Sequence, residues 1–152
     1  MKKLLLFLAA FVAFVAADIE KDGKEFFRGV HRRCQEDPKT GVPEEQVKRL
    51  YQGFWKDCPK LKIHMVCMYR GFNYIDQHGI INKDLLKSQW STLYNKEDFQ
   101  KLLKCLVQKC NTTDTVWDLA RCKHDTVGSV IELETLWYDK GGNDTGRVVT
   151  CN

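Results

Sequence analysis

The chain has 152 residues, 43% of them hydrophobic, and its 24 basic and 20 acidic residues give a formal net charge of +4. Charges of both signs are interspersed along the whole chain, which excludes the clustered basic surface of a nucleic-acid-binding protein and the polybasic segment of a membrane-surface protein. A chain of this length and composition can bury a substantial core as one domain.

Residues 1–17 have the pattern of a secretory signal peptide. Lys2 and Lys3 precede an apolar run that is too short and too close to the N-terminus for a typical membrane span, with an uncleaved signal anchor as the alternative. We expect cleavage after Ala17, which leaves residues 18–152 as a single secreted, extracellular domain. All seven cysteines survive this cleavage, and an oxidising compartment favours their pairing in disulfides.

Helical periodicity dominates the first half of the mature chain. Apolar residues at helical spacing predict a helix over residues 19–35. Pro43 is typical of a first helical turn, and the apolar face of this second helix is expected to extend to Phe54. Pro59 predicts the start of a third helix that runs to Phe72. Apolar residues surround most of this third helix, so it is predicted to be central and buried.

Two asparagines mark helix starts in the second half. Asn82 is expected to cap a helix over residues 83–93, and Asn95 is expected to cap one over residues 96–110. The residues that follow, NTTD at 111–114, are interpreted as a break in the chain.

A short helix is then expected to reach Cys122. The capping box from Ser129 to Glu132 predicts a last helix over residues 129–139, before an irregular tail over residues 140–152. No alternating strand pattern competes with these helices. The sequence therefore predicts an all-α protein of six or seven short helices.

The stretch DCPKLKIHMVCMYRGF, residues 57–72, raises the question of a metal or redox site. It contains Cys58, His64 and Cys67, but zinc needs four ligands, and no CxxC, HxH or HExxH spacing occurs in the chain. We therefore expect no metal here, and we expect His64 to be a partly buried or surface histidine. No GxSxG, phosphate loop or paired-carboxylate signature is present, so no enzyme activity is expected.

Two Asn-x-Thr sequons occur, at Asn111 and Asn143. Both lie in predicted connectors, where a glycan can be accommodated. Asn111 is equally suited to act simply as a turn residue.

Large aromatic and methionine side chains are numerous for such short helices. They are expected either to fill a tightly packed core or to enclose an apolar cavity, and methionine and aromatic residues suit adaptable small-molecule pockets. Periodicity alone does not separate a filled core from a hollow one.

Four cysteines stand at informative spacings, at Cys34, Cys67, Cys105 and Cys122, and Cys67 is followed by MYRGFNYIDQHGIIN. This pattern resembles the insect odorant-binding protein family, of the pheromone and general odorant-binding type, over about residues 24–125. The resemblance implies a compact, disulfide-linked domain of six to seven helices that encloses an apolar cavity.

Two positions depart from the family framework together. Ile63 and Thr113 stand where the family usually has two cysteines that pair with each other. Their joint absence resembles the minus-C subgroup. The resemblance then implies that two disulfides remain: Cys34–Cys67 and Cys105–Cys122.

Three further cysteines, Cys58, Cys110 and Cys151, are extra to this pattern. At most two of them can pair with each other, which leaves one thiol free or available for dimerisation. A Cys58–Cys151 bridge would hold the long tail over the third helix. A related family of salivary amine-binding proteins also has extra C-terminal cysteines and a longer tail.

The resemblance implies a secreted carrier that reversibly binds small hydrophobic ligands, such as odorants, pheromones or other semiochemicals, in an internal helical cavity. We expect no cofactor, no binding to nucleic acid or membrane, and a monomer or weak dimer, with a membrane receptor as a candidate partner. Tyr94 and the tryptophan N–H groups are expected to supply polar contacts. The predicted wall consists of large apolar and aromatic residues: Met65, Met68, Phe72, Trp90, Tyr94, Leu102, Leu106, Trp117, Leu133 and Trp137.

Two alternatives stay open. A scavenger of biogenic amines or lipid mediators on a related fold would need buried carboxylates, for which Glu132 and Glu134 are the candidates. A secreted effector would have a core filled by its own side chains.

Ligand release is also expected to depend on pH through His64, His78 and His124, and an affinity that stays flat between about pH 5 and 7 would exclude this.

Overall fold

The computed structural model describes residues 23–128. Several expectations lie outside the described residues, namely the signal peptide, the last helix at 129–139 and the tail at 140–152. The residues concerned include Glu132, Leu133, Glu134, Trp137, Asn143 and Cys151.

The described chain is all-α, as the sequence predicts. Its only β feature is an isolated antiparallel bridge between Ile75 and Ile81 in the turn after the third helix. The helices are a segment at residues 23–36, α2 (Glu44–Tyr51), α3 (Pro59–Gly71), α4 (Lys83–Leu93), α5 (Lys96–Leu103) and α6 (Thr112–Val127).

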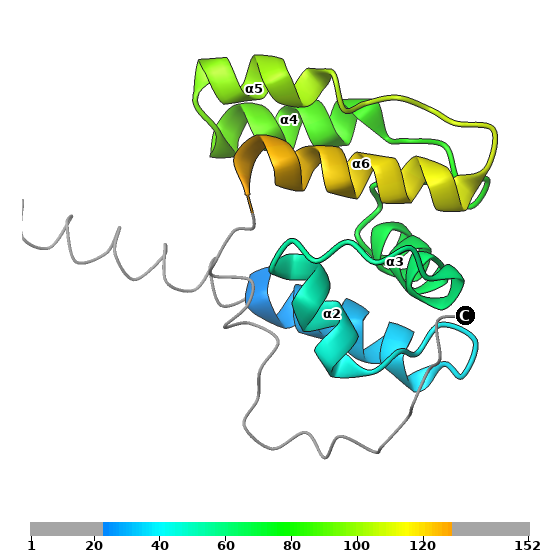
Figure 1. Cartoon of the computed structure of the whole chain (residues 1–152). Coiled ribbons are helices and arrows are strands. Elements are labelled where there is room, and N and C mark those ends of the chain that lie inside the picture. Colours follow the sequence, from blue (N-terminus) through cyan, green and yellow to red (C-terminus); the bar gives the residue numbers. More distant parts are fainter. Residues whose placement is uncertain (1–22, 129–152) are drawn as a thin grey trace, which may run out of the picture.

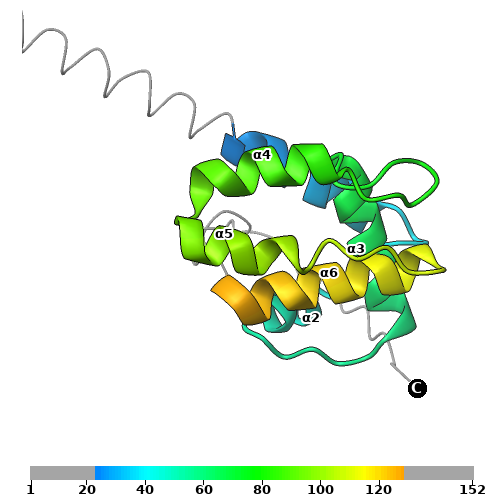
Figure 2. The same cartoon turned by 90° about the horizontal axis from the view of Figure 1, so that it is seen from above.

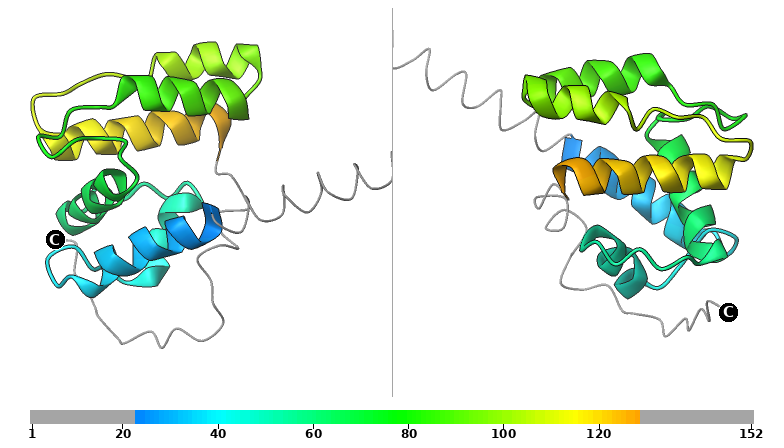
Figure 3. Two further views of the ribbon diagram at one scale, coloured as in Figure 1. Left: turned by 180° about the vertical axis from the view of Figure 1, so that it is seen from behind. Right: turned by 45° about the horizontal axis from the view of Figure 1, so that its top comes forward.

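The helices form two groups on either side of α3 (Figure 1). On one side, α5 packs against both α4 and α6, and α6 packs directly on α3. On the other side lie α2 and the segment 23–36, drawn in blue and cyan. Seen from above, α3 crosses beneath α6 rather than running along it (Figure 2). The view from behind, on the left of Figure 3, also shows α3 between the two groups.

The buried apolar side chains form two clusters, one large and one small. The main cluster joins α2, α3, α4, α5 and α6, and its members include Leu61, Leu86, Leu102 and Leu119. The small cluster lies between α3 and the segment 23–36 and consists of Val30, Cys34, Met68 and Phe72. The prediction that α3 is central is confirmed, since it contributes to both clusters.

Local sequence signals place the helix starts correctly. The side chain of Asn82 accepts a hydrogen bond from Leu85 N at the start of α4, and that of Asn95 accepts one from Asp98 N at the start of α5. Asn111 does the same for α6, where it accepts from Asp114 N. The NTTD segment is therefore a helix start and not a break, and α6 extends beyond Cys122 to Val127.

Two predicted helices are too long. The helix expected over residues 96–110 ends at Leu103, because the chain tightens into a turn in which Cys105 N donates to Leu102 O at 2.9 Å. The α2 helix ends at Tyr51, and Gly53 follows with a φ of 91° that only glycine adopts easily. Phe54 consequently leaves the predicted apolar face, and 65% of it is exposed.

Both disulfides implied by the resemblance are present. Cys34 pairs with Cys67 and joins the segment 23–36 to α3, while Cys105 pairs with Cys122 and joins the end of α5 to α6. Ile63 and Thr113, where the family usually has a third bridge, lie on α3 and α6. Beside them Lys62 Nζ approaches Asp114 Oδ1 at 3.4 Å, so an ion pair links α3 to α6 next to the missing disulfide.

None of the helices within residues 23–128 is long and apolar enough to cross a membrane.

Candidate functional site

The structure brings most of the described wall residues into one cluster. Met65, Trp90, Leu102, Leu106 and Trp117 are all buried in the main cluster, with exposed fractions of 6% or less. Tyr94 packs against the same cluster and is partly buried. These residues come from α3, α4, α5, α6 and the chain just after α5.

Met68 and Phe72 do not share that cluster. They point to the other side of α3 and pack with Val30 and Cys34 under the segment 23–36. The ring of Phe72 lies 4.5 Å from that of Phe27, centroid to centroid. The predicted wall is therefore divided between the two faces of α3.

The predicted wall includes Tyr94 but omits two other tyrosines at the margin of the main cluster, Tyr69 and Tyr74. Tyr69 lies on α3, Tyr74 lies in the turn that follows α3, and Tyr94 caps the end of α4. The rings of Tyr69 and Tyr74 meet edge to face at 5.5 Å. The three residues come from three separate segments, and no spacing in the sequence indicates that they lie at the margin of one cluster.

The three phenols are partly withdrawn from water. Burial raises the pKa of the Tyr69 hydroxyl well above its usual value, and nearby Tyr74 and Tyr94 raise it further. Burial, with a further contribution from Tyr94, raises the pKa of Tyr74 to about 12. All three side chains nevertheless keep part of their surface accessible. Within the described residues, none of the three hydroxyls is a buried group that lacks a hydrogen-bond partner.

Lys123, which is not among the residues predicted from the sequence, lies on the face of α6 that packs against the main cluster. Val116, Ala120, Lys123 and Val127 follow one another at spacings of four, three and four residues, which places them on one helix face. Val116 and Ala120 are buried in the main cluster. The ammonium of Lys123 lies 6.0 Å from the centre of the Tyr94 ring. Lys123 is partly buried, and this burial lowers the pKa of its ammonium.

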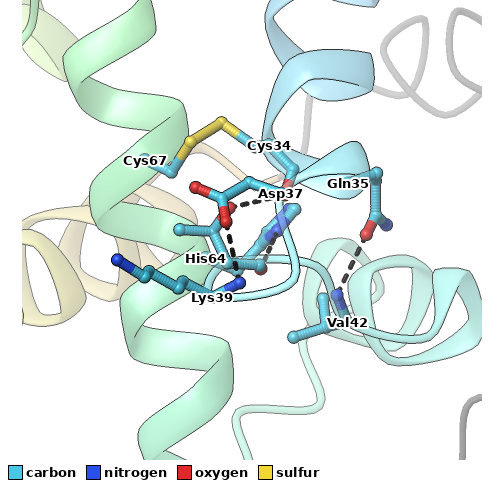
Figure 4. The surroundings of a disulfide bond; sticks show 8 residues. Cys34, Gln35, Asp37, Lys39, Val42, His64 and Cys67 are labelled. Carbon is cyan, nitrogen blue, oxygen red and sulfur yellow. Dashed lines mark hydrogen bonds between the residues drawn. A yellow bond between two sulfur atoms is a disulfide. The ribbon is translucent and has the colours of Figure 1, made fainter.

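A second cluster of polar side chains lies beside the Cys34–Cys67 disulfide. His64 is 0% exposed, which corrects the expectation of a partly buried or surface histidine. Its Nδ1 is 2.9 Å from the carbonyl oxygen of Thr40 (Figure 4). The ring of His31 meets it edge to face at 5.7 Å, and His31 Nε2 is itself 2.9 Å from Glu44 Oε1. This cluster joins α3 to the segment 23–36 and α2.

Protonation of His64 is unfavourable in the folded protein. Burial is the largest cause and lowers the pKa of His64 to about 4, although the hydrogen bond with Thr40 opposes this. His64 therefore stays neutral in the folded state between about pH 5 and 7, which argues against its part in the expected pH-dependent release. Burial raises the pKa of Glu44, but hydrogen bonds from His31 and Gln35 lower it more, so that its net shift is downward.

We expect acid to destabilise the fold through these groups. A folded pKa below the unfolded one means that the unfolded chain binds the proton more readily, so stability is full above about pH 6.5 and falls toward pH 4. The shift of His64 corresponds to a loss of at most about 3 kcal/mol. Chemical unfolding curves at several pH values measure this loss, to which Glu44 adds at the acid end.

The variant His64→Gln should flatten the pH dependence between pH 6.5 and 4, because it removes the buried titrating group. His78→Gln is the matched control, since His78 is exposed in the turn after α3. An unchanged slope in His64→Gln would contradict this assignment.

An outer depression between α2 and α3 is a poor candidate for the ligand site. It has a volume of about 160 Å³ and its lining includes Gln46, Phe54, Lys56 and Leu61. Ligand pockets commonly exceed about 300 Å³. Most of the predicted wall residues lie instead in or against the main cluster, whose margin carries the three tyrosines.

The extra cysteines differ in state. Cys58 is disulfide-bonded and buried at the start of α3, whereas Cys110 is an exposed free thiol. Together with the Cys34–Cys67 bond, this state of Cys58 commits both cysteines of the 57–72 stretch to disulfides. In the described part of the chain, no group of three or more His, Cys, Asp or Glu side chains is placed to hold a metal ion.

Comparison with known proteins gives the family. A profile described as the PBP/GOBP family matches residues 16–126, which is more than half of the chain. The chain belongs to the PBP/GOBP family. Two proteins of Tenebrio molitor are similar to it: the B1 protein, 27% identical over 118 residues that cover 76% of this chain and 89% of B1, and the B2 protein, 25% identical over 120 residues that cover 78% and 88%. No solved structure matches.

The PBP/GOBP family is the insect odorant-binding family, so the resemblance drawn from the cysteine spacing is confirmed. Its members are secreted proteins that carry small hydrophobic ligands. The all-α, disulfide-linked fold of residues 23–128 agrees with this family.

Proposed function

We propose that this member of the PBP/GOBP family is a secreted carrier that reversibly binds a small hydrophobic ligand, of the odorant or pheromone kind, inside the helical domain. The site proposed is the margin of the main cluster, where Tyr69, Tyr74 and Tyr94 face Met65, Trp90 and their neighbours. Binding would be driven by the removal of apolar surface from water, worth about 25 cal/mol per Å².

One observation carries this proposal. Tyr69, Tyr74 and Tyr94 pack against the main apolar cluster, yet each side chain keeps part of its surface accessible for contact with a ligand. Each tyrosine hydroxyl can also donate a hydrogen bond to a ligand or to water.

The amine-scavenger alternative finds no comparable support within residues 23–128. Such a protein needs a buried carboxylate, and no Asp or Glu side chain in the described part of the chain is buried. Glu132 and Glu134 lie outside the described residues.

A fluorescent apolar probe, N-phenyl-1-naphthylamine, tests the proposal. We expect saturable binding that an unbranched aliphatic alcohol displaces. Tyr94→Ala should weaken probe binding about tenfold, because it removes aromatic contact surface.

Leu93→Ala is the matched control, since Leu93 is the neighbouring residue and is 70% exposed. It should leave probe binding unchanged. A protein that is folded by circular dichroism but binds no displaceable probe would have a filled core, and the secreted-effector alternative would then hold.

A further inference from the structure

We propose that the ligand of this protein is amphipathic, with a carboxylate head group that pairs with Lys123 beside Tyr94. The inference rests on the proposed carrier function and adds the chemical class of the ligand. A long-chain carboxylic acid has the required combination of an anionic head and an apolar tail.

The position of Lys123 is unusual for a lysine. Most lysines keep the ammonium in water even when the aliphatic stem is buried. Lys123 instead follows Val116 and Ala120 on the inward face of α6, and its ammonium lies within 6.0 Å of the Tyr94 ring centre. Lys123 is partly buried, and this burial lowers the pKa of its ammonium.

No carboxylate of the described residues neutralises this charge. The three acids of α6 are engaged elsewhere: Asp114 with Lys62, Asp118 with Lys109 at 2.9 Å, and Asp125 with Arg121 at 3.8 Å. Within residues 23–128, no acidic side chain lies within 4.0 Å of the Lys123 ammonium. A partly buried cation without a counter-charge favours an anionic ligand, since pairing offsets the cost of its desolvation.

The tyrosines complete a head-group site. Tyr94 lies beside the Lys123 ammonium, and the rings of Tyr69 and Tyr74 meet edge to face at 5.5 Å at the margin of the same cluster. Each hydroxyl can donate one hydrogen bond to a carboxylate oxygen. The apolar tail would then lie along the main cluster.

The proposal is tested by displacing N-phenyl-1-naphthylamine from the full disulfide-bonded protein. Three competitors of the same chain length are compared: a 16-carbon carboxylic acid, its alcohol and its methyl ester. We expect the acid to displace the probe at a concentration at least about tenfold lower, since a charge-assisted pair is stronger than a neutral one. An acid no better than the alcohol would overturn the proposal. Absence of any probe binding would instead overturn the carrier function itself.

Lys123→Met should remove the preference for the acid and leave displacement by the alcohol unchanged, whereas Lys123→Arg should retain the preference. Lys104→Met is the matched control, because Lys104 is exposed at the end of α5. An acid preference that survives in Lys123→Met would overturn the assignment of Lys123.

A measurement on the unaltered protein guards against variants that fail to fold. The 13C chemical shift of a labelled carboxyl carbon reports whether the acid is ionised. We expect the bound acid to stay ionised to a lower pH than the free acid. A bound acid that titrates at or above the pH of the free acid would contradict pairing with Lys123.

Discussion

Replacement of both Cys34 and Cys67 by alanine is expected to lower the free energy of unfolding by about 4 kcal/mol, the chain-entropy value for a loop of this length. The two residues are 33 positions apart, and their bond is the covalent link between the segment 23–36 and α3. Urea unfolding of the purified variant measures the loss. The His31–Glu44–His64 cluster beside the disulfide would then hold this side of the molecule without a covalent link.

Two other replacements provide comparisons for this loss of stability. Removal of Cys105 and Cys122, which are 17 positions apart, should cost less, about 3 kcal/mol, because the loop is shorter. Cys110→Ala should have little effect, since its thiol is free and exposed. Equal losses in all three variants would mean that loop closure does not govern their stability.

Gly79→Ala is the second change with a large expected effect, a loss of about 3 kcal/mol. Gly79 has a φ of 83°, and a Cβ at this position would overlap the side chain of Thr112 at the start of α6. The Gly79 carbonyl also accepts a hydrogen bond from Gln108, whose Oε1 accepts another from Ile81 N. A shift of this turn would therefore disturb both α4 and α6. Thermal and urea unfolding measure the effect.

Two comparisons separate the causes. Gly29→Ala lies in the helical segment 23–36, where the new Cβ would meet only Arg33 at 3.9 Å, and it should be neutral or slightly stabilising because alanine favours helix. Thr112→Ala combined with Gly79→Ala should recover part of the loss, since it removes the atoms nearest to the new Cβ. No recovery would mean that backbone strain alone is responsible.

Helix starts could be predicted because their causes are local. Asn82 and Asn95 each bond a backbone N–H three residues later, and such spacing is visible in the sequence. The end of α5 could not be predicted in this way. Apolar residues continue at helical spacing past Leu103, but the turn at Cys105 and its bond to Cys122 depend on how α5 meets α6.

The two disulfides could be predicted because the family framework carries their pairing. The head-group site could only partly have been predicted. Lys123 carried a signal, because it interrupts an apolar stripe that runs from Val116 to Val127. No sequence signal indicates that Tyr69, Tyr74 and Tyr94 lie at the margin of one cluster, because this depends on how α3, the turn after it and α4 are placed in space.

The burial of His64 also could not be predicted from the sequence. A histidine within an apolar helix can face solvent or the interior, and its sequence neighbours do not decide between the two. Its burial follows from the approach of Thr40 and His31, which belong to a different part of the chain.

The central claim is that a ligand occupies the interior between α3, α4 and α6. A crystal of the protein with 12-bromododecanoic acid tests it most directly, because the anomalous signal of bromine locates the tail. We predict a carboxylate beside Lys123 and Tyr94, and a bromine peak against the main cluster near Met65 and Trp90. A bromine peak in the outer depression beside Phe54, or an interior filled by side chains with no bromine, would contradict the claim.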